Sequence, residues 1–101
     1  MDFQNLEVVK NEINHRFELE VNGFIAFVDY KERGSVITLI HTEAPAELQG
    51  TGAARALVEK TLQYLEENHF TLIPLCPFVF AYIRKNPEWK RIVNESFRKF
   101  D

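Results

Sequence analysis

The period of the apolar residues changes between the two halves of the chain, and this change restricts the fold more than any other feature. In residues 16–21, Phe17, Leu19 and Val21 alternate with charged residues, which is the pattern of a strand with one buried face. After Gly50 the apolar residues recur at helical spacing. A chain with both periods must pack helices against a sheet, so we predict an α+β (mixed α/β) fold.

The first half is predicted to form an antiparallel meander. Asn22-Gly23 separates two apolar runs and is the pair that best suits a two-residue hairpin turn, because both residues tolerate positive φ. We predict strands over residues 15–21, 24–30 and 35–41, with 6–9 as a candidate fourth.

The second half is predicted to continue as helix, strand and helix. Residues 50–67 form an amphipathic helical pattern that ends near Asn68, and the short apolar run 70–75 suits a strand. Pro77 is placed for the first turn of a second helix. Asn86-Pro87 repeats that signal and predicts a last helix carrying Trp89, Ile92 and Val93.

Composition narrows the class of protein. The 101 residues suit one domain, 1–101, and 46% hydrophobic residues are enough for a core. A net charge of −3 and a pI near 5.6 argue against a nucleic-acid binder or an anionic-membrane binder. The single cysteine, Cys76, permits no internal disulfide. Without signal-peptide features at the N-terminus, we expect a cytoplasmic protein.

The segment Gln49-Gly50-Thr51-Gly52-Ala53-Ala54 lies between a predicted strand and the long helix. Glycines let a backbone approach a ligand closely, and the free N–H groups of a first helical turn attract phosphate. The segment is neither a Rossmann fingerprint nor a Walker loop, because the glycine spacing differs and no lysine follows the second glycine. Spacing alone leaves open that the glycines only shape a tight turn.

The same six residues match the acetyl-CoA motif of the GNAT superfamily, Gln/Arg-x-x-Gly-x-Gly/Ala. The C-terminal half, from a His-Thr-Glu run through Pro-x-Cys-Pro-Phe to a Tyr-x-x-x-x-Pro-Glu segment, resembles a compact GNAT-like family. That resemblance implies a small GNAT-like fold in which Gln49 through Ala54 hold the pyrophosphate of acetyl-CoA, with Arg55 nearby. Position 49 is Gln where the compact family often has Arg, and position 53 is Ala where a larger aliphatic residue is common.

Three residues are candidates for the acyl-transfer chemistry. Cys76 stands at a predicted helix start, which favours a thiolate that could accept an acetyl group; its alternative is an inert buried cysteine. The resemblance places this cysteine close to the CoA sulfur. His41 is a candidate general base or a partner of Cys76. We rank His41 narrowly above Glu43 as the general base. Each has an alternative role: His41 as a structural histidine, and Glu43 as a solvated carboxylate.

Further candidates lie on the second predicted helix and after it. Tyr82 matches the position where larger GNATs place a tyrosine that protonates the leaving thiolate, although packing is its default role. Arg84, or its neighbour Lys85, is a candidate partner of the CoA 3′-phosphate in a basic cluster that otherwise indicates a solvated helix face. No metal site is predicted, because His15 and His69 lack partners at ligand spacing.

The resemblance therefore implies an acetyltransferase with acetyl-CoA as donor and an amine acceptor that the sequence does not identify. Two alternatives stay open: a non-catalytic CoA-binding or regulatory module, and a plain interaction domain. The short chain leaves little material for an acceptor pocket. We expect a monomer or a weak homodimer, with the aromatic tail (Phe97, Phe100) packed on the domain or on a second chain.

Overall fold

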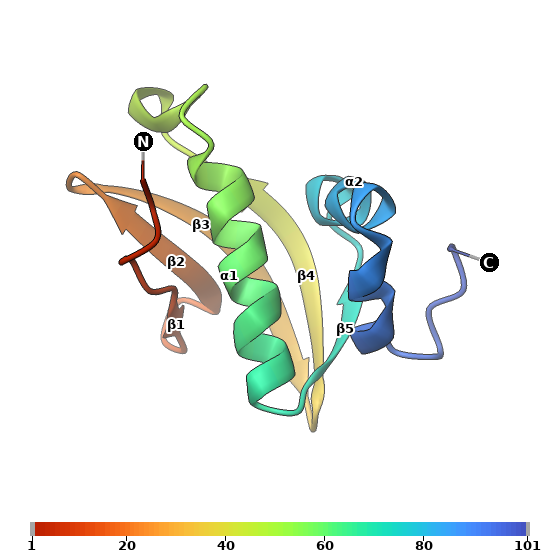
Figure 1. The fold of residues 1–101 in the computed structure, drawn as a ribbon. Helices are drawn as coiled ribbons and strands as arrows, with labels where there is room; N and C mark the ends of the chain where they lie inside the picture. The colour runs from red at the N-terminus through yellow and green to blue at the C-terminus, as the bar shows by residue number, and fades with distance from the viewer. Residues whose placement is uncertain (1, 101) are drawn as a thin grey trace.

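The structure, a computed structural model, describes residues 2–100 and consists of a five-stranded sheet with helices on one face (Figure 1). The elements are β1 (Val9–Asn11), β2 (Arg16–Val21), β3 (Phe24–Arg33), β4 (Val36–Glu43), the 3₁₀ helix η1 (Ala46–Leu48), α1 (Ala53–Glu67), β5 (Thr71–Pro74), α2 (Pro77–Lys85) and the 3₁₀ helix η2 (Pro87–Ile92). The strand order is β1-β2-β3-β4-β5, antiparallel except for the parallel pair β4 and β5. The predicted α+β fold is confirmed.

The hairpin predicted at Asn22-Gly23 joins β2 to β3. Asn22 has φ 53° and Gly23 has φ 84°, the two positive values that such a turn needs, and Val21 pairs with Phe24 across it. This register turns Phe17 and Leu19, both fully buried, toward the core.

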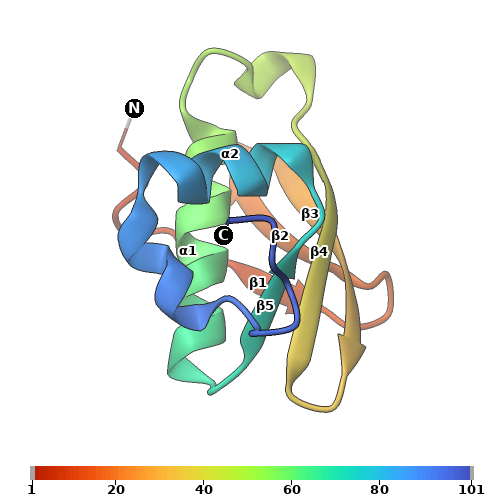
Figure 2. The same ribbon diagram turned by 90° about the vertical axis from the view of Figure 1, so that its right-hand side faces the viewer.

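Helix α1 lies across the sheet and covers its apolar face (Figure 1). Leu57, Val58, Leu62 and Leu65 on the inner side of α1 are fully buried. Burial of each such side chain contributes about 1.5–3 kcal/mol, which holds the helix on the strands. Helix α2 packs at the far end of the sheet, beyond β4 and β5 (Figure 2).

Several predicted boundaries differ from the structure. Strand β3 extends to Arg33 rather than ending at residue 30, and β4 extends to Glu43 rather than ending at residue 41. The first strand is Val9–Asn11 rather than residues 6–9, because its partners across the ladder are Arg16 to Glu18. Helix α1 begins at Ala53 rather than Gly50, since Gly50 and Gly52 both have positive φ, a value outside the helical region. The last helix is the short 3₁₀ helix η2, and Val93 instead forms a bridge with Leu72.

A β-bulge in β4 decides which way its last residues point. Tyr30 pairs with Leu39 and Asp29 pairs with His41, so Ile40 is an extra residue without a partner on β3. Before the bulge Leu39 faces the core. After it Thr42, opposite the buried Val28, faces the core, while His41 and Glu43 point to the opposite face of the sheet.

No helix formed by residues 2–100 has the length and apolar character needed to cross a bilayer.

Candidate functional site

The two parallel strands at the end of the sheet separate where several of the predicted site residues lie. Strands β4 and β5 pair from Val36 and Thr71 as far as Leu39 and Pro74. Strand β4 then continues to Glu43, while β5 ends and the chain turns into α2. A proline at the last position suits this end, because it has no N–H to extend the ladder. Residues 40–43 thus have no partner strand on the β5 side.

The loop after β4 leads to the glycine turn, where backbone N–H groups alternate between bonded and free. The N–H of Gln49 donates to Ala46 O at 3.2 Å, that of Thr51 to Leu48 O at 3.2 Å, and that of Ala53 to Thr51 Oγ1 at 3.2 Å. Within residues 2–100, the N–H groups at positions 50, 52, 54 and 55 have no partner. The turn therefore presents four unpaired donors, not the complete run from 49 to 54 that the resemblance implied.

Both glycines of the turn are required by the backbone. Gly50 has φ 76° and Gly52 has φ 89°, conformations that L side chains rarely adopt. A Cβ at Gly50 would meet no atom within 4 Å, while one at Gly52 would lie 3.6 Å from the ring of Phe3. The surface over Gly50 is therefore open, and the N-terminal segment packs beside Gly52.

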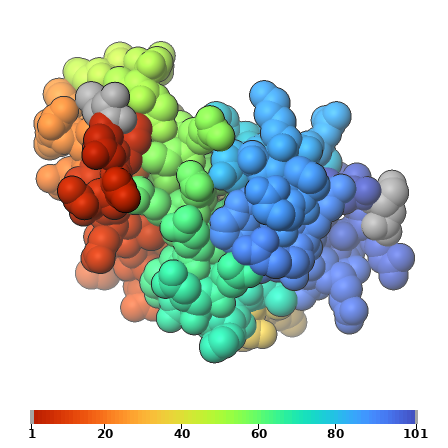
Figure 3. Space-filling view, in the orientation of Figure 1, coloured from red at the N-terminus to blue at the C-terminus, as the bar shows by residue number. Residues whose placement is uncertain are grey.

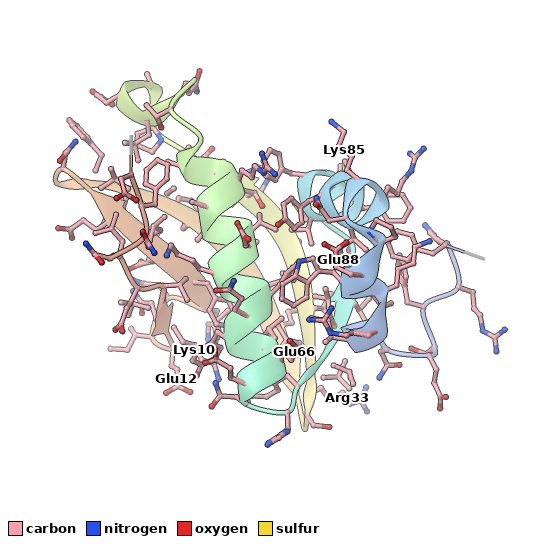
Figure 4. The ribbon with its side chains drawn as sticks, viewed as in Figure 1. Lys10, Glu12, Arg33, Glu66, Lys85 and Glu88 are labelled. Atoms are coloured by element: carbon pink, nitrogen blue, oxygen red, sulfur yellow. The ribbon has the colours of Figure 1, made fainter. Side chains whose placement is uncertain are left out.

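A groove of about 370 Å³ runs from the start of α1 to α2 and carries two cations. Arg55 comes from the first turn of α1 and Lys85 from the last residue of α2, and neither forms an ion pair within the described part of the chain. Lys85 projects at the end of the molecule where α1 begins (Figure 4), and Figure 3 shows the surfaces of α1 and α2 in contact. The unpaired donors and the two cations suit an anionic ligand.

Tyr82 lines the same groove and is 9% exposed. Burial raises the pKa of its phenol, the nearby Glu59 carboxylate raises it further, and Arg55 opposes the shift. The phenol is therefore protonated at neutral pH and able to donate a proton to a group in the groove.

Cys76 is buried at the N-terminus of α2, with 2% of its surface exposed. Its N–H donates to Leu39 O at 2.9 Å, and its Sγ lies 3.2 Å from Thr42 Oγ1. The thiol thus bridges the split between the strands through Thr42. Cys76 is not among the residues that line this groove.

His41 and Glu43 form a pair on the other face of the sheet. Nε2 of His41 is 3.7 Å from Oε1 of Glu43, and both side chains are more than half exposed. The contact between His41 and Cys76 that the sequence allowed is not formed, because the bulge turns them to opposite faces and Thr42 takes that place. Thr42 was missed from sequence, since only the bulge shows that it faces inward.

Arg84 is not among the residues of α2 that line the groove. It lines a second cavity with Pro77 and Phe80, and its guanidinium is 6.0 Å from the Phe80 ring centroid. Lys85, the alternative considered with it, is the residue that joins Arg55. The assignment of Arg84 to the cofactor stays a prediction that this geometry does not favour.

Metal ligands do not gather in the part of the chain that the structure describes: residues 2–100 contain no group of three His, Cys, Asp or Glu placed to hold an ion.

Comparisons with known proteins give matches both to a protein family and to a solved structure. The model of a protein family described as GCN5-related N-acetyl-transferase matches residues 16–92. The fold is similar to the NMR structure of a GCN5-like protein from Staphylococcus aureus, with a TM-score of 0.64, 23% identity and 90% of each chain covered. The matched segment includes the split strands, the glycine turn and both helices that form the groove.

Proposed function

The chain belongs to the GCN5-related N-acetyltransferase family, and from that membership and the geometry above we propose that it binds acetyl-CoA between α1 and α2 and transfers the acetyl group to an amine. The observation that carries the proposal is the row of unpaired N–H groups at positions 50, 52, 54 and 55, which ends at a groove containing Arg55 and Lys85. N–H groups at a helix start, together with cations, suit a diphosphate. The CoA diphosphate lies on those N–H groups, and Lys85 meets a phosphate.

The acetyl group then reaches the split between β4 and β5. Residues 40–43 lack a partner strand on that side, so the thioester lies along the free edge of β4. The amine nitrogen forms a bond to the thioester carbonyl carbon, and the carbon–sulfur bond breaks. The nitrogen loses a proton and the CoA sulfur gains one, so the reaction yields an amide and free CoA.

Two groups lie in positions suited to these proton transfers. Tyr82, protonated at neutral pH, gives its proton to the departing thiolate from within the groove. The His41–Glu43 pair, on the opposite face and next to the free edge of β4, takes the proton from the amine.

Cys76 is assigned a positioning role in this reaction. Its thiol is buried and contacts Thr42, so direct attack by the amine fits the structure better than a covalent acetyl-cysteine. Intact-mass measurement after incubation with acetyl-CoA distinguishes the two. We expect no acetyl adduct on either the wild type or Cys76→Ser. An adduct on the wild type alone would establish the covalent step instead.

A thermal-shift titration tests the binding step, because a ligand that binds only the folded state raises its stability by RT ln(1 + [L]/Kd). We expect acetyl-CoA to raise the melting temperature, and the double variant Arg55→Gln/Lys85→Gln to lose most of that rise. Lys31→Gln, an exposed site on β3, is the matched control. If acetyl-CoA does not stabilise the wild type, the proposed function is wrong. Binding without release of CoA in the presence of any amine would favour the non-catalytic module.

We also propose that the protein acts in the cytoplasm, in keeping with its single cysteine and the absence of disulfides in residues 2–100.

A further inference from the structure

The C-terminal segment after η2 folds back onto the edge of the sheet. Val93 forms a bridge with Leu72, the N–H of Asn94 donates to Leu72 O at 2.8 Å, and the Asn94 amide donates to Thr71 Oγ1 at 2.9 Å. Figure 2 shows this segment passing in front of β5 and below α2. These contacts fix the segment to β5.

Aromatic residues hold the rest of the segment against α2. The rings of Phe80 and Phe100 stack at 4.5 Å between centroids with 8° between their planes, and Phe97 lies 6.1 Å from Phe80. The aromatic tail thus packs on its own domain, which is one of the two alternatives that the sequence left open. Stacked pairs of this kind stabilise a contact beyond the area that they bury.

Between this segment, α2 and the end of β5 lies a separate cavity of about 350 Å³. Its walls are apolar, from Leu75, Pro77, Phe80 and Phe97, and its polar groups are the cations of Arg84 and Lys99. Within residues 2–100 neither cation has a carboxylate at ion-pair distance. Leu75 is 56% exposed although it is a large apolar side chain. The cavity has the size and character of a site for a small molecule.

The cavity is next to the proposed reaction centre but distinct from the acetyl-CoA groove. Leu75 and Pro77, the residues on either side of Cys76, both line it. The groove holds Tyr82 and Lys85 of α2, the cavity holds Phe80 and Arg84, and Ala81 lines both. The donor groove and the acceptor cavity therefore lie on adjacent faces of α2.

We propose that this cavity binds the acceptor, and that the acceptor is a small primary amine carrying an apolar or aromatic group and a carboxylate, as in an apolar amino acid. This inference rests on the proposed acetyltransferase function. The apolar group lies between Leu75, Phe80 and Phe97, and the carboxylate is bound by Arg84 with Lys99. The amine then points toward Cys76 and the split, where its nitrogen bonds to the acetyl carbon as that carbon leaves the CoA sulfur.

The short chain leaves little material for an acceptor pocket, and in this cavity residues 93–100 supply one wall. A carboxylate is favoured over a second ammonium group because a cationic acceptor would meet Arg84 and Lys99.

Two-dimensional NMR on the labelled full chain, saturated with CoA, tests the proposal without needing turnover. Phenylalanine and phenethylamine are matched probes that differ by the carboxylate. We expect phenylalanine to shift the amide signals of Leu75, Phe80, Arg84 and Phe97, and to bind at least tenfold more tightly than phenethylamine. Arg84→Gln should remove that preference, Arg84→Lys should restore part of it, and Lys60→Gln, an α1 residue remote from the cavity, should leave it unchanged.

The possible outcomes distinguish a failure of the acceptor assignment from a failure of the proposed acetyl-CoA binding. If CoA shifts the signals of the glycine turn but phenylalanine shifts none in the cavity, or if both probes bind equally, the acceptor assignment is wrong and the proposed function stands. Stronger binding of a lysine-containing peptide than of phenylalanine would likewise overturn it. If CoA itself produces no shifts, both proposals fall.

Discussion

Substitution of Gly50 by alanine separates the backbone requirement of the glycine turn from its role in ligand binding. Gly50 has φ 76°, and a Cβ built on it meets no atom within 4 Å. Gly23, in the β2–β3 hairpin, has φ 84° and is open in the same way. Gly23→Ala is therefore a matched control, with a similar positive φ at a residue that does not line the groove.

The cost to folding is expected to be similar in the two variants. Holding alanine in the left-handed region costs about 1–2 kcal/mol, and restriction of the unfolded chain offsets roughly 0.4–1 kcal/mol of this. The net loss is about 1 kcal/mol, which corresponds to a fall of roughly 4–8 °C in the melting temperature of a domain of this size. No overpacking adds to this cost, because the space around both glycines is empty.

The effect on ligand binding is expected at Gly50 alone. A methyl group there occupies the open surface over the turn and displaces the Gly50 N–H from the diphosphate. Loss of one charge-assisted hydrogen bond costs about 1.5–3 kcal/mol, which is roughly a tenfold to hundredfold rise in the Kd of acetyl-CoA. Gly23→Ala should leave the Kd within about twofold of the wild-type value, since it affects no contact with the ligand.

Urea unfolding of the wild type, Gly50→Ala and Gly23→Ala measures the cost to folding. Isothermal titration calorimetry with acetyl-CoA measures the Kd of the same three proteins. Equal loss of affinity in Gly50→Ala and Gly23→Ala would show that general destabilisation, not the cradle, explains the effect. Unchanged affinity in Gly50→Ala would refute the reasoning that places the diphosphate on this turn.

Three further predictions concern two residues of the groove, Lys85 and Tyr82, and the surface ion pair of Arg91 and Glu66. Lys85→Gln should raise the Kd of acetyl-CoA several-fold at low salt and much less at 1 M salt, where charge interactions are screened; an effect independent of salt in calorimetric titrations would contradict a phosphate contact. Burial raises the pKa of Tyr82. The free energy of unfolding that depends on the protonated phenol is therefore fully present below pH 10, and it is lost as the pH rises through the pKa of the folded state. Tyr82→Phe should therefore lose less stability than the wild type between pH 9 and 11 in urea titrations, and parallel curves would refute this. The Arg91 guanidinium, whose Nε is 2.6 Å from Oε2 of Glu66, lowers the pKa of that carboxyl. The pair stabilises the fold above the ordinary pKa of glutamate, and this stability is lost as the pH falls through the lowered pKa of Glu66. In Glu66→Gln the melting temperature should therefore fall less steeply with decreasing pH on the acid side.

Local patterns in the sequence determined the elements and the turns between them. Asn22-Gly23 specified the hairpin because only a few residues accept positive φ. The alternation around Phe17 and the helical spacing around Leu57 each identified a buried face, since burial favours one side of a strand or a helix. The two glycines before α1 marked the turn for the same conformational reason.

Only the tertiary structure decided how the candidate site is divided between the two faces of the sheet. The bulge at Ile40 shifts the alternation of β4 by one residue, so Thr42 rather than His41 meets Cys76. The bulge is set by pairing with β3, and no pattern within β4 reports it. Likewise the packing of α2 decides that Lys85 faces the groove and Arg84 the second cavity. Both choices depend on contacts between segments far apart in the chain, whereas periodicity describes only near neighbours.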